Sequence, residues 1–333
     1  MTITHLNRKQ EFDILKGLLI VCVVMGHTDT GIPFIDVFWF HMPAFFMITG
    51  FLTRSWLSPI DIFHAIKIKD KFILSRLAKY LIPYFTYCFV FYLIFHTEPA
   101  LKNIVRVFYA GSNNVTIYSF PYWYINALFI GILAMGVCTT WEKKYQYGVI
   151  VIIWIFLHTG VIHLLPVPLP WGIDNALGAV VYLYIGYIAN MYIHEIKSLK
   201  RLKLLFLFVP ALFIFVNFDY SINYQINMKS MIYNYLFLDL VVPISFTYLL
   251  YNVSCILKHI PVFNAILICL GNASMTIYFT HAAILWIMRD TYSDFIRIST
   301  GLIVGIILHR LFSYIRILQI LFLGKFSAFK INI

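Results

Sequence analysis

The feature that most limits the fold of this chain is a series of long apolar segments. An α-helix needs about 20 apolar residues to cross the hydrocarbon core of a bilayer. Because lipid offers no hydrogen bonds, a crossing backbone must satisfy its own polar groups, as a helix does. Segments near this length lie at 13–30, 33–53, 80–97, 122–141, 146–164, 174–194, 203–219, 231–251, 262–288 and 299–323.

This pattern predicts an all-α fold, a polytopic membrane helix bundle of about ten transmembrane spans. We find no internal repeat and no low-complexity linker, so we expect a single membrane domain over residues 1–333.

The composition supports a membrane protein and argues against a nucleic-acid partner. Hydrophobic residues make up 61 % of the chain and charged residues 12 %, whereas a soluble domain carries about 25 % charged residues. The formal net charge of +11 is then expected to face anionic lipid at the surface of the bilayer. The five cysteines form no C-x-x-C pair, so neither a disulfide framework nor a metal site is predicted.

The basic residues indicate an orientation. With the N-terminus inside, twenty of the 25 Lys and Arg residues fall on the cytoplasmic side or at inner ends of spans. This bias predicts a multi-pass protein of the cell membrane with both termini cytoplasmic. The largest inner loop, 54–79, mixes lysines with apolar residues. It is either an amphipathic helix on the inner leaflet or a simple topology signal.

The first segment carries charges inside an apolar run. Ten residues separate Lys16 from His27, and eleven steps of about 100° return to within about 20° of the same helix face. We therefore expect Lys16 and His27 to share a face, with Asp13 one turn before Lys16. A cation at one depth and a titratable base further in suggest a site that holds an anion and moves a proton.

A second histidine is expected at a similar depth. In the segment 262–288, Gly271 and Asn272 interrupt the apolar run and Ser274 can cap a helix start. If the crossing begins near Gly271, His281 lies about 15 Å along it, close to the depth of His27. Ionisable residues inside a membrane usually have functional roles.

Five short motifs follow one another along the chain, and together they are specific. They are Lys16 and His27 at their spacing, HMPAFFMITGF at 41–51, Arg76 before Pro83 and Tyr84, Trp123-Tyr124-Ile125, and Leu270-Gly271 with Ser274, Ile277-Tyr278 and His281. In this order they resemble the acyltransferase 3 family, most closely its fucose 4-O-acetylase-like branch. Lysine at position 16 replaces the commoner arginine, and Thr49 replaces the usual serine.

The resemblance implies a membrane O-acetyltransferase that moves an acetyl group from cytosolic acetyl-CoA, its co-substrate, to a sugar hydroxyl. The acceptor would belong to a surface polysaccharide or a lipid-linked glycan. In this interpretation His27 is the general base, because imidazole titrates near neutrality. His281 and Asp29 assist it, and Lys16 and Arg76 hold the phosphates of the donor.

Other residues have weaker assignments. We expect His41, Asp174 and Trp123 to contribute to acceptor binding, while helix packing would explain His41 nearly as well and interface anchoring would explain Asp174 equally well. Lys16 could instead extend its charge to lipid headgroups, and Asp29 could be only interfacial. Asn126 and Ser274 are candidates for oxyanion donors if they face a cavity.

A different class of function also fits the segments. Ten spans with buried polar residues are compatible with a polysaccharide exporter that does no acyltransferase chemistry. Transporters of this size often show two related halves, and the absence of a visible repeat favours the enzyme.

Overall fold

The computed structural model describes most of the chain and is helical. Within the described residues there is no β-strand, and the only bridge of that type is an isolated pair, Asn227 and Ile232. The all-α prediction is confirmed. The described residues are 10–28, 34–53, 56, 60, 63, 64, 71–95, 100–111, 119–164, 167–193, 195, 199–219 and 223–325.

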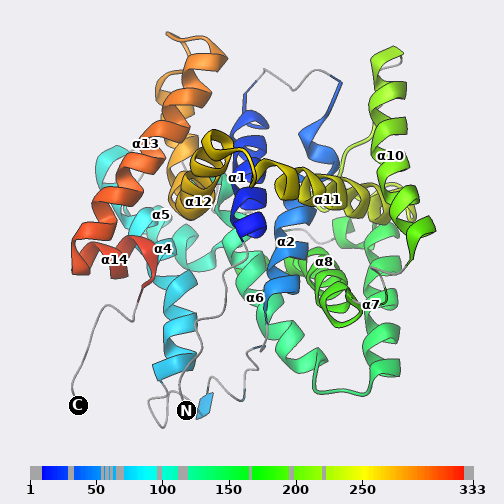
Figure 1. The fold of residues 1–333 in the computed structure, drawn as a ribbon. Helices are drawn as coiled ribbons and strands as arrows, with labels where there is room; N and C mark the ends of the chain where they lie inside the picture. Colours follow the sequence, from blue (N-terminus) through cyan, green and yellow to red (C-terminus); the bar gives the residue numbers. More distant parts are fainter. Residues whose placement is uncertain are drawn as a thin grey trace, which may run out of the picture.

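The helices follow the apolar segments of the sequence, so every expected span contains one (Figure 1). Their bounds are α1 Gln10–Met25, α2 His41–Leu52, α4 Lys71–Phe95, α5 Ala100–Tyr109, α6 Trp123–Cys138, α7 Lys143–His158, α8 Ile173–Met191, α10 Lys200–Asp219, α11 Leu238–Leu257, α12 Pro261–Ile287, α13 Asp294–Tyr314 and α14 Arg316–Leu323.

Seven of the described helices are long and apolar enough to cross a membrane, which supports a multi-pass membrane protein. Three of the expected spans are shorter: α1 and α7 have 16 residues each and α2 has 12. Sixteen residues rise about 24 Å, less than the roughly 30 Å of a bilayer core. By this criterion seven helices of the described residues qualify as spans, and the predicted count of ten is not confirmed.

Two boundaries differ from the sequence prediction. The last expected span, 299–323, is two helices, because Ile315 is extended (φ −108°, ψ 120°) between α13 and α14. Helix α14 then packs against α4. The expected interruption at Gly271 and Asn272 is wrong, since α12 runs without a break from Pro261 to Ile287.

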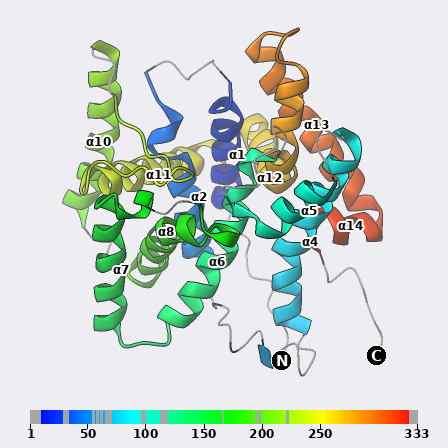
Figure 2. The same ribbon diagram turned by 180° about the vertical axis from the view of Figure 1, so that it is seen from behind.

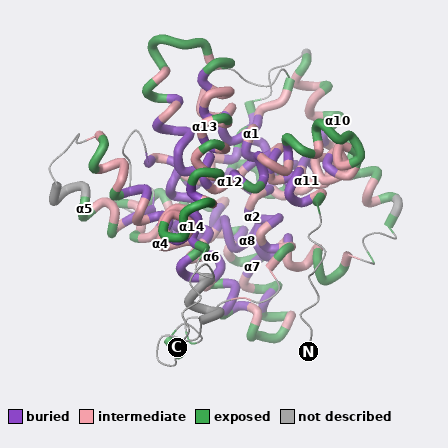
Figure 3. The backbone as a smooth tube through the Cα atoms, turned by 60° about the vertical axis from the view of Figure 1, so that its left-hand side comes forward, coloured by how far each residue is buried: buried purple, intermediate pink, exposed green. Residues whose placement is uncertain are grey.

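Helix α1 lies in the middle of the molecule, where it packs against α12, α11, α2 and α13 (Figures 1 and 2). Burial follows this arrangement: residues of α1 and α8 are mainly buried, whereas α10 is largely exposed (Figure 3). In the apolar window of α10 only 6 % of residues are buried, against 67 % in that of α8. In a membrane protein the exposed apolar side of α10 faces lipid.

Glycines set the close crossing of α1 and α12. A methyl group on Gly17 would collide with the backbone carbonyl of Leu267, and one on Gly271 would collide with that of Asp13. Small residues let helix backbones approach closely inside membranes. These two backbone contacts keep α1 and α12 side by side, so residues further along the two helices also come into contact.

Candidate active site

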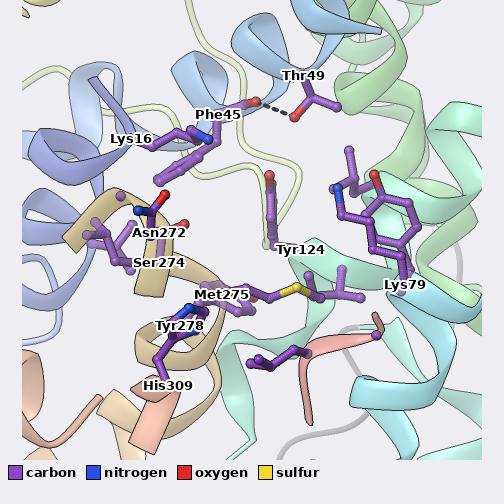
Figure 4. Close-up of a pocket in the computed structure, with 18 of the residues that line it drawn as sticks. Lys16, Phe45, Thr49, Lys79, Tyr124, Asn272, Ser274, Met275, Tyr278 and His309 are labelled. Atoms are coloured by element: carbon purple, nitrogen blue, oxygen red, sulfur yellow. Dashed lines mark hydrogen bonds between the residues drawn. The ribbon is translucent and has the colours of Figure 1, made fainter. Parts of the chain in front are cut away.

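A cavity of about 340 Å³ opens between α1, α2, α4, α6 and α12. This volume is at the lower end of the range for small-molecule sites. In Figure 4, Lys16 and Lys79 approach the cavity from different walls, with Tyr124 between them. The polar residues of the lining are Lys16, Thr49, Lys79, Tyr80, Tyr124, Asn272, Ser274, Tyr278, His309 and Lys325.

The cavity is electropositive. Its lining includes the ammonium groups of Lys16, Lys79 and Lys325, and the described lining residues include no carboxylate. Behind the wall, the buried carboxylate of Asp13 pairs with Lys16, with 2.7 Å between Nζ and Oδ1. This pair fixes the direction of Lys16 and cancels part of its charge. The other two lysines leave a net positive site that suits an anionic ligand.

The C-terminal segment closes one side of the cavity. Gly324 ends α14 in the left-handed conformation (φ 62°), which favours glycine. A side chain there would collide with the backbone of Lys79. This contact places Lys325 beside Lys79, although nearly 250 residues separate them in the sequence.

The long axis of the cavity follows α1 and α12. On α1 the lining residues are Lys16, Ile20 and Val23, which the helical repeat stacks on one face. On α12 the lining runs from Gly271 to Tyr278. Seven residues of helix rise about 10 Å.

The cavity thus leads from Lys16 towards Tyr278. His281 is the next residue of this face of α12, and His27 lies just past the end of α1.

His27 and His281 meet one turn beyond the cavity. Their rings stack with 5.2 Å between centroids and 20° between planes. The edge of Phe120 contacts His27 from another side, with 4.8 Å between centroids. The distance between Tyr278 and His281 ring centroids is 6.1 Å. The two histidines that the sequence places at one depth are therefore in contact.

Hydrogen bonds define which nitrogen of His281 is basic. The Nδ1 atom lies 3.0 Å from the carbonyl of Ile277. A carbonyl only accepts, so Nδ1 carries the proton and Nε2 keeps its lone pair. That Nε2 atom is buried and has no hydrogen-bond partner among the described residues. His281 itself is fully buried, whereas His27 is partly exposed.

His41 belongs to the same neighbourhood. Its Nδ1 lies 2.6 Å from the carbonyl of Val37, so its proton also sits on Nδ1. A second proton on His41 would make the ring cationic and would disfavour a proton on His27. Helix α1 ends at Met25, and His27 follows in a turn. The prediction that a continuous helix face joins Lys16 to His27 is therefore wrong in detail.

Two predicted site residues are only partly covered by the structure. Asp29 lies outside the described residues. Arg76 lies in α4 three residues before Lys79, but its side chain is not among those described. Their expected roles stay predictions.

Two other predicted residues lie outside the cavity lining. Asp174, at the start of α8, accepts the backbone N–H groups of Leu169 (3.2 Å) and Asn175 (2.9 Å), so its carboxylate holds the preceding loop. Trp123 is buried at the start of α6. Neither is among the residues that line the cavity.

A loop between α10 and α11 covers the histidines. The ammonium of Lys229 lies 5.2 Å from the centroid of the Phe120 ring, and Lys229 acts electrostatically on His27. The side-chain amide of Asn175 donates to the carbonyls of Met228 and Lys229 at 2.9 and 2.8 Å. Partial burial lowers the pKa of Lys229. This loop brings a cation close to His27.

A second buried polar cluster lies apart from the cavity. His158 contacts the Trp154 carbonyl through Nδ1 (2.8 Å) and the Asp239 carboxylate through Nε2 (3.1 Å). The backbone N–H of Tyr235 donates to the same carboxylate at 3.1 Å. These bonds tie α7 to α11, so this buried histidine and carboxylate hold two helices together.

Sequence reasoning assigned no role to several residues of the cavity. Lys79 lies three residues after Arg76, which the sequence assigns to the donor site. Residues three apart share a helix face, so this spacing could have placed Lys79 beside Arg76. For Lys325 no local signal exists, since it reaches the cavity only through tertiary packing. Tyr124 belongs to the Trp123-Tyr124-Ile125 motif, but only the structure shows that it lines the cavity.

The chain was also compared with known proteins. The family model described as an acyltransferase domain, Acyl_transf_3, matches residues 9–318. No curated protein and no solved structure matches the chain.

Proposed function

The chain belongs to the acyltransferase 3 family, and from this membership and the cavity we propose that it is a membrane O-acetyltransferase. It takes an acetyl group from cytosolic acetyl-CoA and transfers it to a hydroxyl of a surface polysaccharide or lipid-linked glycan. The observation that carries the proposal is a cavity that starts among lysines and ends beside a stacked histidine pair.

The cationic part of the cavity suits the donor. Acetyl-CoA carries its negative charge on phosphates at one end and its reactive thioester at the end of a long thin arm. Lys16, Lys79 and Lys325 supply ammonium groups for the phosphates. The narrow apolar remainder, lined by Ile20 and Val23 among others, accepts the arm. We expect Arg76 to join the same cationic group.

The histidine pair suits the proton transfer. In the reaction, the hydroxyl oxygen of the acceptor forms a bond to the thioester carbon while His27 takes the hydroxyl proton. The carbon–sulfur bond then breaks, and the proton passes from His27 to the sulfur of the leaving CoA. His27 is the better base because the residue is partly exposed, whereas His281 is fully buried.

His281 supports this role. Two imidazolium rings 5.2 Å apart would repel each other, so the pair is suited to take up a single proton at a time. The hydrogen bond from His281 Nδ1–H to the Ile277 carbonyl keeps the His281 ring oriented against His27. The loop with Lys229 and the neighbouring His41 lie on the acceptor side in this arrangement.

The membrane orientation follows from the donor. Acetyl-CoA is cytosolic, so the lysine end of the cavity faces the cytoplasm of a cell membrane and the Lys229 loop faces outward. Both termini are then cytoplasmic, as the distribution of basic residues predicts.

The experiment compares surface glycans from matched cells with and without the protein. Cells are grown with isotopically labelled acetate, and purified glycans are examined by mass spectrometry. We expect labelled acetyl groups, released by mild base, only in cells that have the protein. Identical acetylation in both samples would contradict the proposal. If cells without the protein instead lack the glycan itself at their surface, the protein is an exporter.

A further inference from the structure

Tyr278 lines the cavity, and its buried hydroxyl has no acceptor for its proton among the described residues. The side chain of Tyr278 is 6 % exposed, and its hydroxyl has no hydrogen-bond partner among the described residues. The backbone N–H of Tyr124 is nearby, but an N–H group donates and cannot accept. Leaving a buried polar group unpaired costs about 1–3 kcal/mol, so such a group calls for an explanation.

Its position distinguishes Tyr278 from the other unpaired groups. The described chain has further buried side-chain polar atoms without partners, including those of Tyr87, Asn126 and Tyr233. Among them, Tyr278 alone also lines the cavity. Figure 4 shows Tyr278 on the cavity wall near Met275. One turn further along α12, the histidine pair begins with His281, 6.1 Å from Tyr278 between ring centroids.

The ring is held firmly in this place. Tyr124 packs against it with 5.4 Å between centroids and a 60° angle between planes. Phe279 packs against it at 5.7 Å. A donor fixed in this way needs no reorganisation when charge develops beside it, which is the condition for effective electrostatic catalysis.

We propose that Tyr278 donates its hydroxyl hydrogen bond to the carbonyl oxygen of the acyl donor, and that this bond stabilises the oxyanion formed during transfer. The inference rests on the proposed acetyl transfer. When the acceptor oxygen attacks, the two electrons of the carbon–oxygen π bond move to the carbonyl oxygen, which becomes negative. They return when the carbon–sulfur bond breaks. Tyr278 keeps its own proton throughout and contributes only the hydrogen bond.

Two other residues fit this role less well. Asn126 has a buried, unpaired Nδ2 atom, but it does not line the cavity, and its Oδ1 accepts from Gly111 at 3.2 Å. Ser274 lines the cavity but is partly exposed, so water can satisfy its hydroxyl. Neither combines a buried, unpaired donor with a place in the cavity lining.

The test compares two tyrosine variants of the purified full-length protein in liposomes. Tyr278→Phe removes the hydroxyl and keeps the ring. Tyr87→Phe is the control, since it also removes a buried hydroxyl, which lies near Thr276, but from a residue that does not line the cavity. Each is assayed with acetyl-CoA and with surface polysaccharide isolated from cells that lack the protein.

We expect Tyr278→Phe to lower kcat by about 10²- to 10³-fold, the usual effect of losing one oxyanion donor. Its affinity for CoA, which has no carbonyl at the sulfur, should equal that of the parent. Its unfolding temperature should stay close to that of the parent, because the ring and its packing against Tyr124 are kept. Tyr87→Phe should match the parent in rate.

Three results would overturn the inference. They are a Tyr278→Phe rate close to that of the parent, an equal loss in Tyr87→Phe, or a loss of rate explained fully by weaker CoA binding. A parent protein that transfers no acetyl group would instead overturn the proposed function, and this role with it.

Discussion

His27 and His281 come from helices far apart in the sequence and yet stack ring on ring. Each is unremarkable alone, since single buried histidines usually make only structural hydrogen bonds. Their contact beside a cationic cavity is what indicates chemistry. The sequence identified both residues because ionisable groups inside apolar segments are rare.

At the same scale, Lys16 carries the prediction about the donor. Lys16→Ala should weaken acetyl-CoA binding about 10- to 100-fold, since a charge-assisted hydrogen bond contributes roughly 1.5–3 kcal/mol. Lys16→Arg should retain more affinity because it keeps the charge. Isothermal titration calorimetry on the purified protein measures both.

The control is Lys144→Ala, which removes an exposed lysine paired with Glu142 and outside the cavity lining. Its affinity should equal that of the parent. If Lys16→Ala binds acetyl-CoA as tightly as Lys144→Ala does, Lys16 is not part of the donor site.

Among single residues, the sequence predicted those whose type is unusual for their surroundings. It could not predict a residue of ordinary type that packing brings to the cavity, such as Lys325. The structure shows that the Asp174 carboxylate accepts from the backbone N–H groups of Leu169 and Asn175, while its expected role in acceptor binding stays a prediction.

At the scale of elements, the crossing of α1 and α12 organises the site. Gly17 and Gly271 let the backbones meet, and this contact aligns Lys16 with the cavity and His27 with His281. The sequence led us to expect a break at Gly271, because glycine often ends helices. Local sequence cannot show whether a glycine ends a helix or lets two helices pack closely, because that depends on the helix that packs against it.

Substitution at this crossing tests its role. Gly271→Ala should lower stability by about 1–3 kcal/mol, the usual cost of an overpacked contact, because the new methyl group collides with the Asp13 carbonyl. Acetyl transfer should fall as well, since α1 carries Lys16. Thermal unfolding in detergent and the transfer assay measure the two effects.

Gly148→Ala in α7 is the matched control, as no atom lies within 4 Å of the added methyl group. It should leave stability unchanged or raise it by up to about 1 kcal/mol, because alanine stabilises a helix more than glycine does. An unfolding temperature of Gly271→Ala at or above that of Gly148→Ala would contradict the close crossing.

On the scale of the whole molecule, the apolar segments predicted the fold class, while the predicted number of ten crossings is not confirmed. Hydropathy locates apolar segments, but it does not fix where a helix begins, since α2 starts at His41, eight residues into the apolar segment 33–53. The cavity itself was beyond sequence reasoning, because its walls come from both ends of the chain.

The orientation of the molecule is a separate prediction. Reporter fusions should place residues 142–145 and 200–203 inside and 223–229 outside, in keeping with the excess of basic residues on inner loops. Activity of an inside-specific and an outside-specific reporter at each position measures this. An outside signal from 200–203 would reverse the orientation and would put the lysine end of the cavity away from cytosolic acetyl-CoA.

The central claim joins the cavity, the donor and the histidine pair in one reaction. It is tested by measuring acetyl transfer from acetyl-CoA to isolated surface polysaccharide by the purified parent, His27→Ala and His27→Gln in liposomes. His259→Ala, which changes an exposed histidine outside the cavity lining, serves as the control.

We predict transfer by the parent and by His259→Ala, and a loss of about 10²- to 10⁴-fold in both His27 variants, the usual contribution of a general base. Glutamine should not rescue the rate, because it can form a hydrogen bond but cannot take up the proton. Binding of acetyl-CoA should persist in both variants. Acetylated product from His27→Ala at a rate near that of the parent would contradict the account.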